Sequence, residues 1–137
     1  MKTIYQTALL ALFFFTGLQG AFSQQQNWTV ESPLVNINGN DVELVSVLAK
    51  QGDSLTWEQH GYNTDSSNTF AVTSATGSWD TQSQTGALSY GLSIDGGTAT
   101  LVLTGTEEGI SATLTIEDAV NGNVDTYTFL VDSTTNL

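Results

Sequence analysis

The sequence predicts an all-β fold, a barrel or a sandwich, from two observations. Apolar and hydroxyl-bearing residues alternate through four consecutive runs, so each run has a side-chain period of two and one face to bury. These runs cover residues 88–94, 98–104, 110–117 and 124–131. Turn-forming glycine, asparagine and aspartate residues separate them and indicate an antiparallel meander. Along the whole chain, about eight or nine short strands can be placed at the regular spacing that is typical of barrels and sandwiches.

The N-terminal residues are typical of a secretory signal peptide. A basic residue is followed by an apolar run at residues 4–18, and the small side chains of Ala21 and Ser23 occupy the positions that a signal peptidase reads. We therefore expect a helical signal peptide at residues 1–23 and a single domain at residues 24–137, which is long enough to bury a core.

A membrane anchor is the alternative explanation of the same apolar run. The run is short for a bilayer span, and no basic cluster follows it. No cysteine follows it either, so a lipid anchor is not expected. We expect the mature chain to be secreted or periplasmic, soluble after removal of the signal peptide, and without a membrane span.

The charge balance excludes two classes of partner. Lys50 is the only basic side chain after residue 23, and one positive charge against 14 carboxylates gives a formal net charge of −13. Such a surface repels nucleic acid and anionic membranes, so we expect neither as a partner. The carboxylates are scattered along the sequence, which favours a role in solubility over a dedicated cation site. The chain has no cysteine, so an exported form must be stable without disulfides, as in many bacterial envelope and secreted proteins.

The first strands of the chain are less regular than the meander. Residues 27–31 indicate a short strand with Trp28 and Val30 on one face, which Pro33 weakens or ends. The apolar run 42–49 is either a strand buried on both faces or a short helix across the end of a barrel. Its valines favour the strand.

The segments between these strands and the meander alternate between strand and turn signals. Residues 54–60 alternate and are predicted as a strand, whereas the polar residues 61–68 are predicted as a loop. Residues 69–74 and a segment that begins at Gly77 are predicted as two further strands, and residues 82–85 connect them to the meander.

The order of several short motifs resembles a known family. The motifs are, in order, Trp28, Asn38-Gly39, Leu55-Thr56-Trp57, Thr69-Phe70, Gly77-Ser78-Trp79 and Thr126-Tyr127-Thr128-Phe129. In this order they resemble the small lipocalin-like domains of secreted and envelope proteins in bacteria of the Bacteroidetes type. The chain departs from that pattern in having His60-Gly61 and a longer polar loop in place of an Asp-Gly turn, and in lacking a lipoprotein cysteine. The resemblance implies an up-and-down antiparallel β-barrel with an apolar lumen, and it implies no particular ligand.

The inventory of reactive side chains offers little for catalysis. His60 is the only histidine, and Glu58 would lie on the same strand face and could orient its imidazole. The simpler interpretation is a solvent-facing strand end, so we expect no catalytic residue and no enzyme activity. The acidic pairs Glu107-Glu108 and Glu117-Asp118 fall in turns, where water keeps both carboxylates ionised.

Two oxygen-rich loops could hold Ca²⁺. They cover residues 36–41 and 118–125, and neither has the spacing of an EF-hand loop. Asparagine and aspartate also stabilise turns by bonding to their own backbone, which accounts for both loops without an ion. We therefore expect neither a metal nor a cofactor.

The inward apolar row of the strands is the best candidate for a binding site. Its aromatic members, predicted to bind a ligand in the barrel interior, are Trp57, Phe70, Trp79, Tyr90, Tyr127 and Phe129. A barrel of eight strands is just wide enough to be filled by side chains or to hold one small ligand, so the same residues could equally be a packed core. Two hypotheses follow. The first is a non-enzymatic protein that binds a small apolar or amphipathic molecule in the barrel mouth, and the second is an interaction module that contacts a protein or glycan, with a packed barrel as its scaffold.

Overall fold

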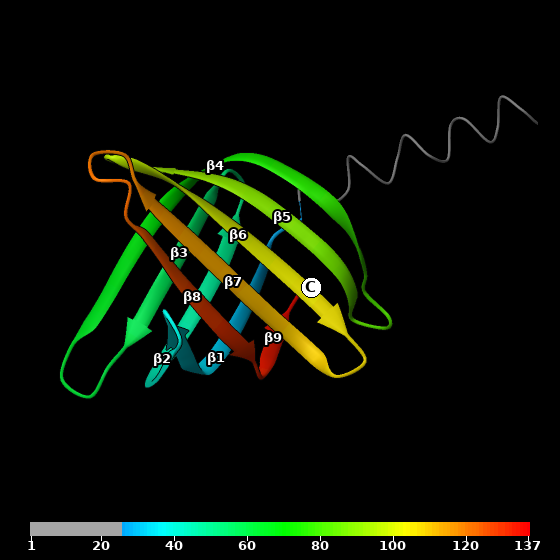
Figure 1. The fold of residues 1–137 in the computed structure, drawn as a ribbon. Helices are drawn as coiled ribbons and strands as arrows, with labels where there is room; N and C mark the ends of the chain where they lie inside the picture. The colour runs from blue at the N-terminus through cyan, green and yellow to red at the C-terminus, as the bar shows by residue number, and fades with distance from the viewer. Residues whose placement is uncertain (1–25) are drawn as a thin grey trace, which may run out of the picture.

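The computed structural model describes residues 26–137, so the expected signal peptide and its cleavage site lie outside the described residues. Nine β-strands make up most of the described chain (Figure 1). The strands are β1 (Trp28–Ile37), β2 (Asn40–Gln51), β3 (Ser54–His60), β4 (Asp65–Asp80), β5 (Thr85–Ile94), β6 (Gly97–Thr106), β7 (Gly109–Asp118), β8 (Val124–Val131) and β9 (Ser133–Thr135). Within residues 26–137, no helix has the length and apolar character needed to cross a bilayer.

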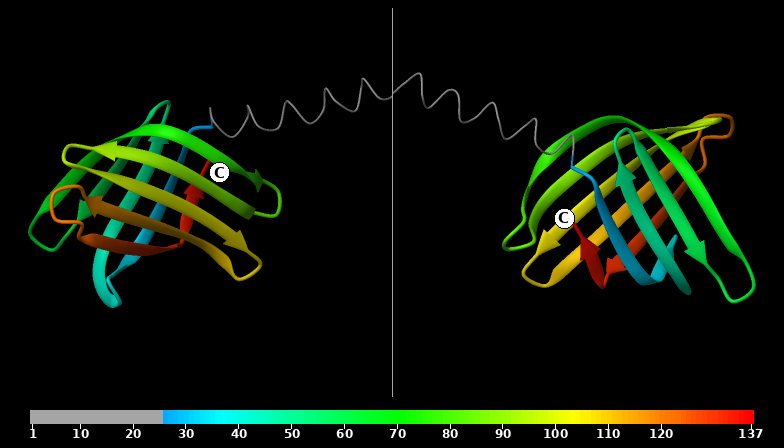
Figure 2. Two further views of the ribbon diagram at one scale, coloured as in Figure 1. Left: turned by 45° about the horizontal axis from the view of Figure 1, so that its top comes forward. Right: turned by 180° about the vertical axis from the view of Figure 1, so that it is seen from behind.

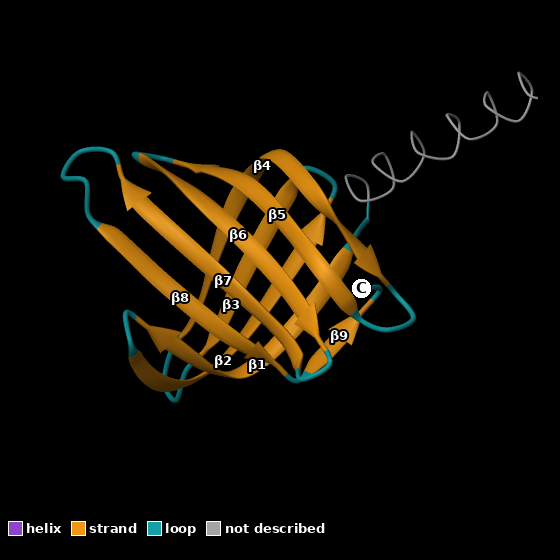
Figure 3. Ribbon diagram, turned by 45° about the vertical axis from the view of Figure 1, so that its right-hand side comes forward, coloured by secondary structure: helices purple, strands orange, loops and turns teal. Residues whose placement is uncertain are grey.

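The strands form a closed barrel. Each strand is antiparallel to its neighbours, and β1 pairs with both β2 and β8, which closes the sheet. The first eight strands therefore form an up-and-down β-barrel (Figure 3), which confirms the predicted fold class. Strand β8 pairs with the second half of β1, where Phe129 faces Val35, and β9 continues along the first half, where Thr135 faces Thr29.

The two ends of the barrel differ in how the chain covers them. The Trp57 mouth is the end that holds the turns at residues 38–39, 61–64, 95–96 and 119–123. The Leu137 end holds the turns at residues 52–53, 81–84 and 107–108, together with residues 132–137. The described chain begins and ends at the Leu137 end (Figure 2), where Gln26 Nε2 donates to the carbonyl of Asn136 at 2.7 Å.

Strand β1 is longer than the sequence predicts. It runs through Pro33 to Ile37, so of the two expected effects Pro33 does not end the strand but interrupts its pairing. The ladder between β1 and β2 shifts register between Ser32 and Leu34, and Pro33 lies exposed in that irregularity. A bulge leaves a backbone position without a ladder bond, so proline is tolerated there. The favoured interpretation of residues 42–49 as a strand is confirmed, because they lie within β2.

Strand β4 corrects two further predictions. Residues 65–68, predicted as a loop, are the start of this strand. The two strands predicted at residues 69–74 and from Gly77 are one strand that runs to Asp80. A register shift against β5 between Val72 and Ser74 interrupts the alternation, which explains why the sequence pattern breaks there.

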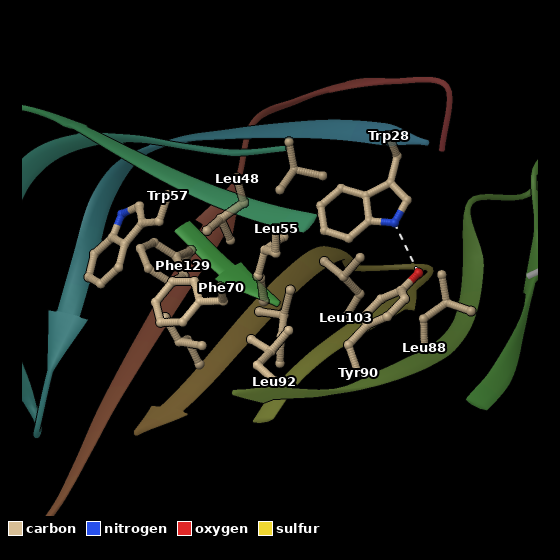
Figure 4. Packing of buried hydrophobic residues seen from close by; sticks show 14 of the residues in the cluster. Trp28, Leu48, Leu55, Trp57, Phe70, Leu88, Tyr90, Leu92, Leu103 and Phe129 are labelled. Carbon is tan, nitrogen blue, oxygen red and sulfur yellow. Dashed lines mark hydrogen bonds between the residues drawn. The ribbon is translucent and has the colours of Figure 1, made fainter. Parts of the chain in front are cut away.

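The core fills the centre of the barrel. The buried apolar side chains are Trp28, Val30, Val35, Leu48, Leu55, Trp57, Phe70, Leu88, Tyr90, Leu92, Ala99, Leu101, Leu103, Ala112, Leu114, Phe129 and Leu137. They form one continuous cluster (Figure 4). Each of the eight barrel strands contributes to it, because alternate residues of every strand face inward. The interior is thus packed at its centre, and any binding surface lies toward one of its ends.

Candidate functional site

The six aromatic residues predicted as a binding site all face the barrel interior, but they divide between its ends. Trp57, Phe70, Tyr90 and Phe129 are buried, whereas Trp79 and Tyr127 are partly buried. Figure 4 shows Phe70 and Phe129 beside Trp57, with Tyr90 on the far side of the cluster next to Trp28. The prediction of one interior site therefore becomes two separate aromatic groups.

Among the buried aromatic residues, Trp57 lies closest to the Trp57 mouth. Its ring meets Tyr127 edge-on at 4.9 Å and 65° between planes, and Phe129 at 5.3 Å and 82°. Such edge-to-face pairs add stability beyond the area that they bury. The indole is only 3% exposed, yet its Nε1 hydrogen has no acceptor within hydrogen-bonding distance. A buried N–H without an acceptor costs about 1–3 kcal/mol relative to a satisfied one.

A row of polar side chains lies beside Trp57 on the inward face of strands β1 to β4. In register, Ser32 of β1 faces Ser46 of β2, Ser46 faces Gln59 of β3, and Gln59 faces Ser66 of β4. Residues directly opposite in an antiparallel pair point to the same side of the sheet, and Gln59 shares the inward face of Trp57. Ser66 Oγ donates to Gln59 Oε1 at 2.7 Å, and Ser32 Oγ donates to the carbonyl of Leu34 at 2.6 Å.

Ser46 is the member of this row without a partner. Its side chain is 1% exposed, and its hydroxyl makes no hydrogen bond. Trp57 and Ser46 lie on adjacent strands, because Trp57 faces Leu48, two residues from Ser46. The mouth thus presents two buried groups, an indole N–H and a hydroxyl, whose hydrogen-bonding capacity is unused.

The wall of the barrel is incomplete beside these two groups. Strand β4 pairs with β5 only from Ala71 onward, so the β3–β4 hairpin extends beyond the end of β5. Asn68 and Ser66 face inward opposite Trp57 and Gln59, yet both are exposed to solvent. The inner face of the hairpin is therefore accessible from outside, which makes this end of the barrel a mouth.

The rim of the Trp57 mouth combines exposed apolar side chains with carboxylates. Its exposed apolar residues are Val42, Val45, Tyr62, Val120 and Val124, which are five of the six large hydrophobic side chains exposed in the described chain. The negative charge of the rim also affects Tyr127, one of the two rings that pack against Trp57. Burial, and secondarily the Asp125 carboxylate, raises the pKa of the Tyr127 hydroxyl above its ordinary value.

The opposite aromatic group is internally satisfied. Trp28 Nε1 donates to Tyr90 Oη at 3.0 Å, a bond that is drawn in Figure 4. Lys50 lies 1% exposed beside this pair, with its Nζ 5.7 Å from the centre of the Tyr90 ring, and it donates to the carbonyl of Gln26 at 3.1 Å. Burial lowers the pKa of Lys50, and the charge of Asp53 partly opposes that shift.

The interior position of Lys50 was missed by sequence reasoning. Charged side chains are almost never fully buried, so composition gives no reason to place this basic residue inside the barrel. The signal was present, because Lys50 is two residues from Leu48 on the same strand and shares its inward face. The interior position of Ser46 follows from the same alternation, because Ser46 is two residues before Leu48 on β2.

Trp79 belongs to the Leu137 end. It faces Gly86, which in turn faces Gly105, and an added Cβ at Gly105 would lie 2.4 Å from Cη2 of the indole. Gly105 thus leaves room for the ring. Trp79 Nε1 and Gln84 Oε1 are also buried without a hydrogen-bond partner. Leu137 is buried in the core, and its carbonyl accepts a hydrogen bond from Gln84 Nε2 at 2.6 Å, so residues 132–137 cover this end.

A shallow surface hollow of about 310 Å³ also lies at the Leu137 end. It is lined by residues 106–110 and 131–134 together with Gln84. None of the six aromatic residues predicted from sequence lines it. Its acidic side chains, Glu107, Glu108 and Asp132, are all exposed, so water solvates their charge.

His60 lies on the outer face of the β3–β4 hairpin. Its Nδ1 is 3.2 Å from the Asp65 carboxylate and its Nε2 is 3.9 Å from that of Glu58, with all three side chains largely exposed. The prediction that Glu58 and His60 share a face is confirmed. The arrangement is an exposed ion pair whenever the imidazole is protonated, and such pairs contribute little to stability.

The two oxygen-rich loops bond within themselves and to each other. Asn36 Oδ1 accepts from the backbone N–H of Gly39 at 2.9 Å, and Asn36 Nδ2 donates to Asp41 at 2.8 Å. Asn38 Nδ2 donates to Asp125 at 3.0 Å and so joins the first loop to the start of β8. These contacts account for Asn36, Asn38 and Asp41 of the first loop as turn-stabilising groups. Among the described residues, no group of three or more histidine or acidic side chains is arranged to hold a metal ion.

Comparison with known proteins adds no assignment: no protein-family model matches the chain, and no curated protein sequence matches it.

Proposed function

We propose that this protein is an exported, non-enzymatic, lipocalin-like binding protein that takes a small amphipathic molecule at the Trp57 mouth. The observation that carries the proposal is the Trp57 Nε1 hydrogen, which is buried without an acceptor at an end of the barrel that solvent can reach. A ligand oxygen at that point would restore a missing hydrogen bond and offset the cost of burying the donor.

The surroundings of Trp57 suit an amphipathic ligand. Tyr127 and Phe129 give an aromatic wall, and Ser46 adds a second free donor on the neighbouring strand. Val42 on the rim shares the inward face of its partner Val35 and can cover the hydrocarbon part of the ligand. Binding sites are generally apolar with a few placed polar groups, and the mouth has that composition. The packed centre of the barrel limits the ligand to a shallow position.

The indole N–H signals of the three tryptophans test this proposal directly. We would titrate ¹⁵N-labelled protein with fatty amides, fatty acids and retinoids, after assigning each indole signal with single Trp→Phe variants. The expected result is that at least one compound shifts the Trp57 indole proton downfield, as a new acceptor requires, and leaves the Trp79 signal in place. The Trp57→Phe variant should then lose at least tenfold in affinity, in line with the removal of a bond worth about 1.4 kcal/mol.

The Trp79→Phe variant is the matched control, because Trp79 Nε1 is also buried without a partner but lies at the covered end. It should bind the same compound with unchanged affinity. If no compound moves the Trp57 signal at millimolar concentration, or if both variants weaken binding equally, the proposal fails.

A contact with a protein or glycan is the second candidate function, and one observation favours it. Tyr62 is fully exposed at the tip of the projecting β3–β4 hairpin. Exposed tyrosines are common anchors in binding surfaces. A partner that binds this hairpin would protect the Tyr62 ring from solvent. Binding of that partner should be lost in Tyr62→Ser and unchanged in Trp57→Phe.

A further inference from the structure

The Trp57 mouth carries more than half of the negative charge of the described chain. Eight of the 14 carboxylates lie within four residues of its four turns: Asp41, Glu43, Glu58, Asp65, Asp95, Glu117, Asp118 and Asp125. Seven of them are exposed, and within residues 26–137 no lysine or arginine lies near these turns, because Lys50 is buried toward the other end. Carboxylates gathered around one opening raise the local concentration of cations and lower that of anions.

A second feature of the same end of the barrel points to a ligand. Trp57 is 3% exposed, and its unpartnered Nε1 hydrogen lies on the inward face, directly opposite Asn68 on the accessible hairpin. The Ser46 hydroxyl, also unpartnered, lies on the adjacent strand. Both groups are hydrogen-bond donors without an acceptor. They can donate to a carboxylate oxygen as readily as to the carbonyl oxygen of an amide or an ester. The need for an acceptor therefore does not distinguish between ligand classes. The negative charge of the rim does distinguish between them.

The field of the rim extends to the aromatic wall. Asp125 Oδ1 accepts from Asn38 Nδ2 at 3.0 Å, which holds this carboxylate at the start of β8. The Asp125 charge raises the pKa of Tyr127, in addition to the effect of burial. Tyr127 is the ring that packs against Trp57 at 4.9 Å, so a ligand beside Trp57 would lie in the same negative field.

We infer that the Trp57 mouth selects neutral and cationic amphipaths that carry a hydrogen-bond acceptor, and that it rejects anionic ones such as fatty acids. This inference rests on the proposed function and specifies the ligand class of the same site. A cationic group would remain at the rim among the carboxylates, while the acceptor reaches Trp57 Nε1 and the apolar part covers Tyr127.

Three octanoyl compounds whose head groups differ in charge provide the test. Octanoate, octanamide and octanoylcholine share one octanoyl tail, each has an oxygen acceptor on the same carbon, and they carry charges of −1, 0 and +1. Dissociation constants would be measured on the full mature domain from the Trp57 indole shift at low salt. We expect octanoylcholine to bind about tenfold more tightly than octanamide, and octanoate about tenfold more weakly. In 0.5 M salt the three constants should converge, because the screening length falls to a few ångströms.

Paired neutralisations locate the effect. Asp95→Asn together with Glu117→Gln removes two charges from the rim at positions that make no side-chain hydrogen bond among those found in the described chain. Glu107→Gln with Glu108→Gln removes two charges from the Leu137 end. The first pair should reduce the ratio of the octanoate and octanoylcholine dissociation constants about threefold. The second pair should leave this ratio unchanged.

The outcomes separate the two proposals. If octanoate binds at Trp57 as tightly as octanamide at low salt, the charge selection is wrong and the binding function stands. If the ratio of the octanoate and octanoylcholine dissociation constants falls equally with both neutralised pairs, the selection is a property of net charge and not of the mouth, which also overturns the inference. If none of the three compounds moves the Trp57 signal, both the selection and the binding function fail for this class of molecule.

Discussion

The two ends of the barrel treat their buried polar groups differently. At the Leu137 end, Trp28 Nε1 donates to Tyr90 at 3.0 Å and Lys50 Nζ donates to Gln26 at 3.1 Å. At the Trp57 mouth, the corresponding indole N–H and the Ser46 hydroxyl have no partner. Both regions belong to the same packed cluster, so the difference lies in how the polar groups are satisfied and not in how deeply the side chains are buried.

The covering of each end gives the physical reason for this difference. Residues 132–137 fold across the Leu137 end, and backbone carbonyls at Asn136 and Leu137 accept hydrogen bonds there. At the mouth, the β3–β4 hairpin instead extends beyond its pairing with β5, and residues 26–137 supply no acceptor for Trp57 Nε1. Trp79 Nε1 and Gln84 Oε1 show that the covered end is not perfectly satisfied either. An unpartnered donor therefore points to a ligand only where it is combined with an accessible wall.

The largest expected effect is at the covered end, in Gly105→Ala. An added Cβ would lie 2.3 Å from the backbone carbonyl oxygen of Gln84 and 2.4 Å from the Trp79 ring, so the backbone of the β4–β5 turn must move. We expect the free energy of unfolding to fall by about 3 kcal/mol, as in other overpacked cores. Urea denaturation of the purified domain would measure it.

Gly61→Ala is the matched change at the mouth. Its added Cβ would lie 3.1 Å from the carbonyl oxygen of Thr64, a contact that a loop can relax. We expect a loss below about 1 kcal/mol. Equal losses in Gly61→Ala and Gly105→Ala would contradict the view that the covered end is the more tightly packed of the two.

The next effect compares satisfied and unsatisfied polar groups. Tyr90→Phe removes the acceptor of Trp28 Nε1 and should destabilise the domain by about 1–3 kcal/mol, because it leaves a buried donor unpaired. Ser46→Ala removes a buried hydroxyl that has no partner in the described chain, so it breaks no hydrogen bond and should not destabilise the domain. Chemical denaturation of both variants beside the wild type gives the two values. A cost for Ser46→Ala as large as that for Tyr90→Phe would show that Ser46 is hydrogen-bonded in solution.

The sequence predicts the meander and the inward row well because both follow from side-chain alternation. All six predicted aromatic residues face inward, and the strand at residues 54–60 matches β3. The failures fall where composition and alternation disagree. Polar residues 65–68 extend β4, although their composition is that of a loop, because pairing with β3 alone holds them in place. Pro33 lies within β1 because a register irregularity accommodates it.

The division of the site could not be predicted from alternation. A period of two gives the face of each residue but not which residues meet across a barrel, so Trp57 and Tyr90 appeared to belong to one lining. Their separation depends on register across several strands. The polar row from Ser32 to Ser66 depends on the same registers and became visible only in the structure. Hydrogen-bond satisfaction, which distinguishes Trp57 from Trp28, likewise depends on contacts between strands that alternation does not specify.

The smallest expected effect concerns the buried cation of the covered end. Burial lowers the pKa of Lys50 below its value in the unfolded chain. Between these two pKa values the unfolded chain keeps a proton that the folded chain has released, so the wild type should gain stability as the pH rises through this window. Lys50→Met lacks the titrating group and has a similar length, so the difference in unfolding free energy between the two proteins isolates the effect from the other titrating groups.

We expect the wild type to gain on Lys50→Met as the pH rises from 7 to 10, measured by urea denaturation at several pH values. Ionisation of Tyr90, whose pKa burial raises, lowers the stability of both proteins at the upper limit of this range and largely cancels in the difference. A difference that is constant with pH would mean that the contacts of Lys50, including the bond to Gln26 and the charge of Asp53, offset its burial in full. The covered end would then satisfy its cation as completely as it satisfies Trp28, and the contrast with the unpartnered donors of the Trp57 mouth would be sharper still.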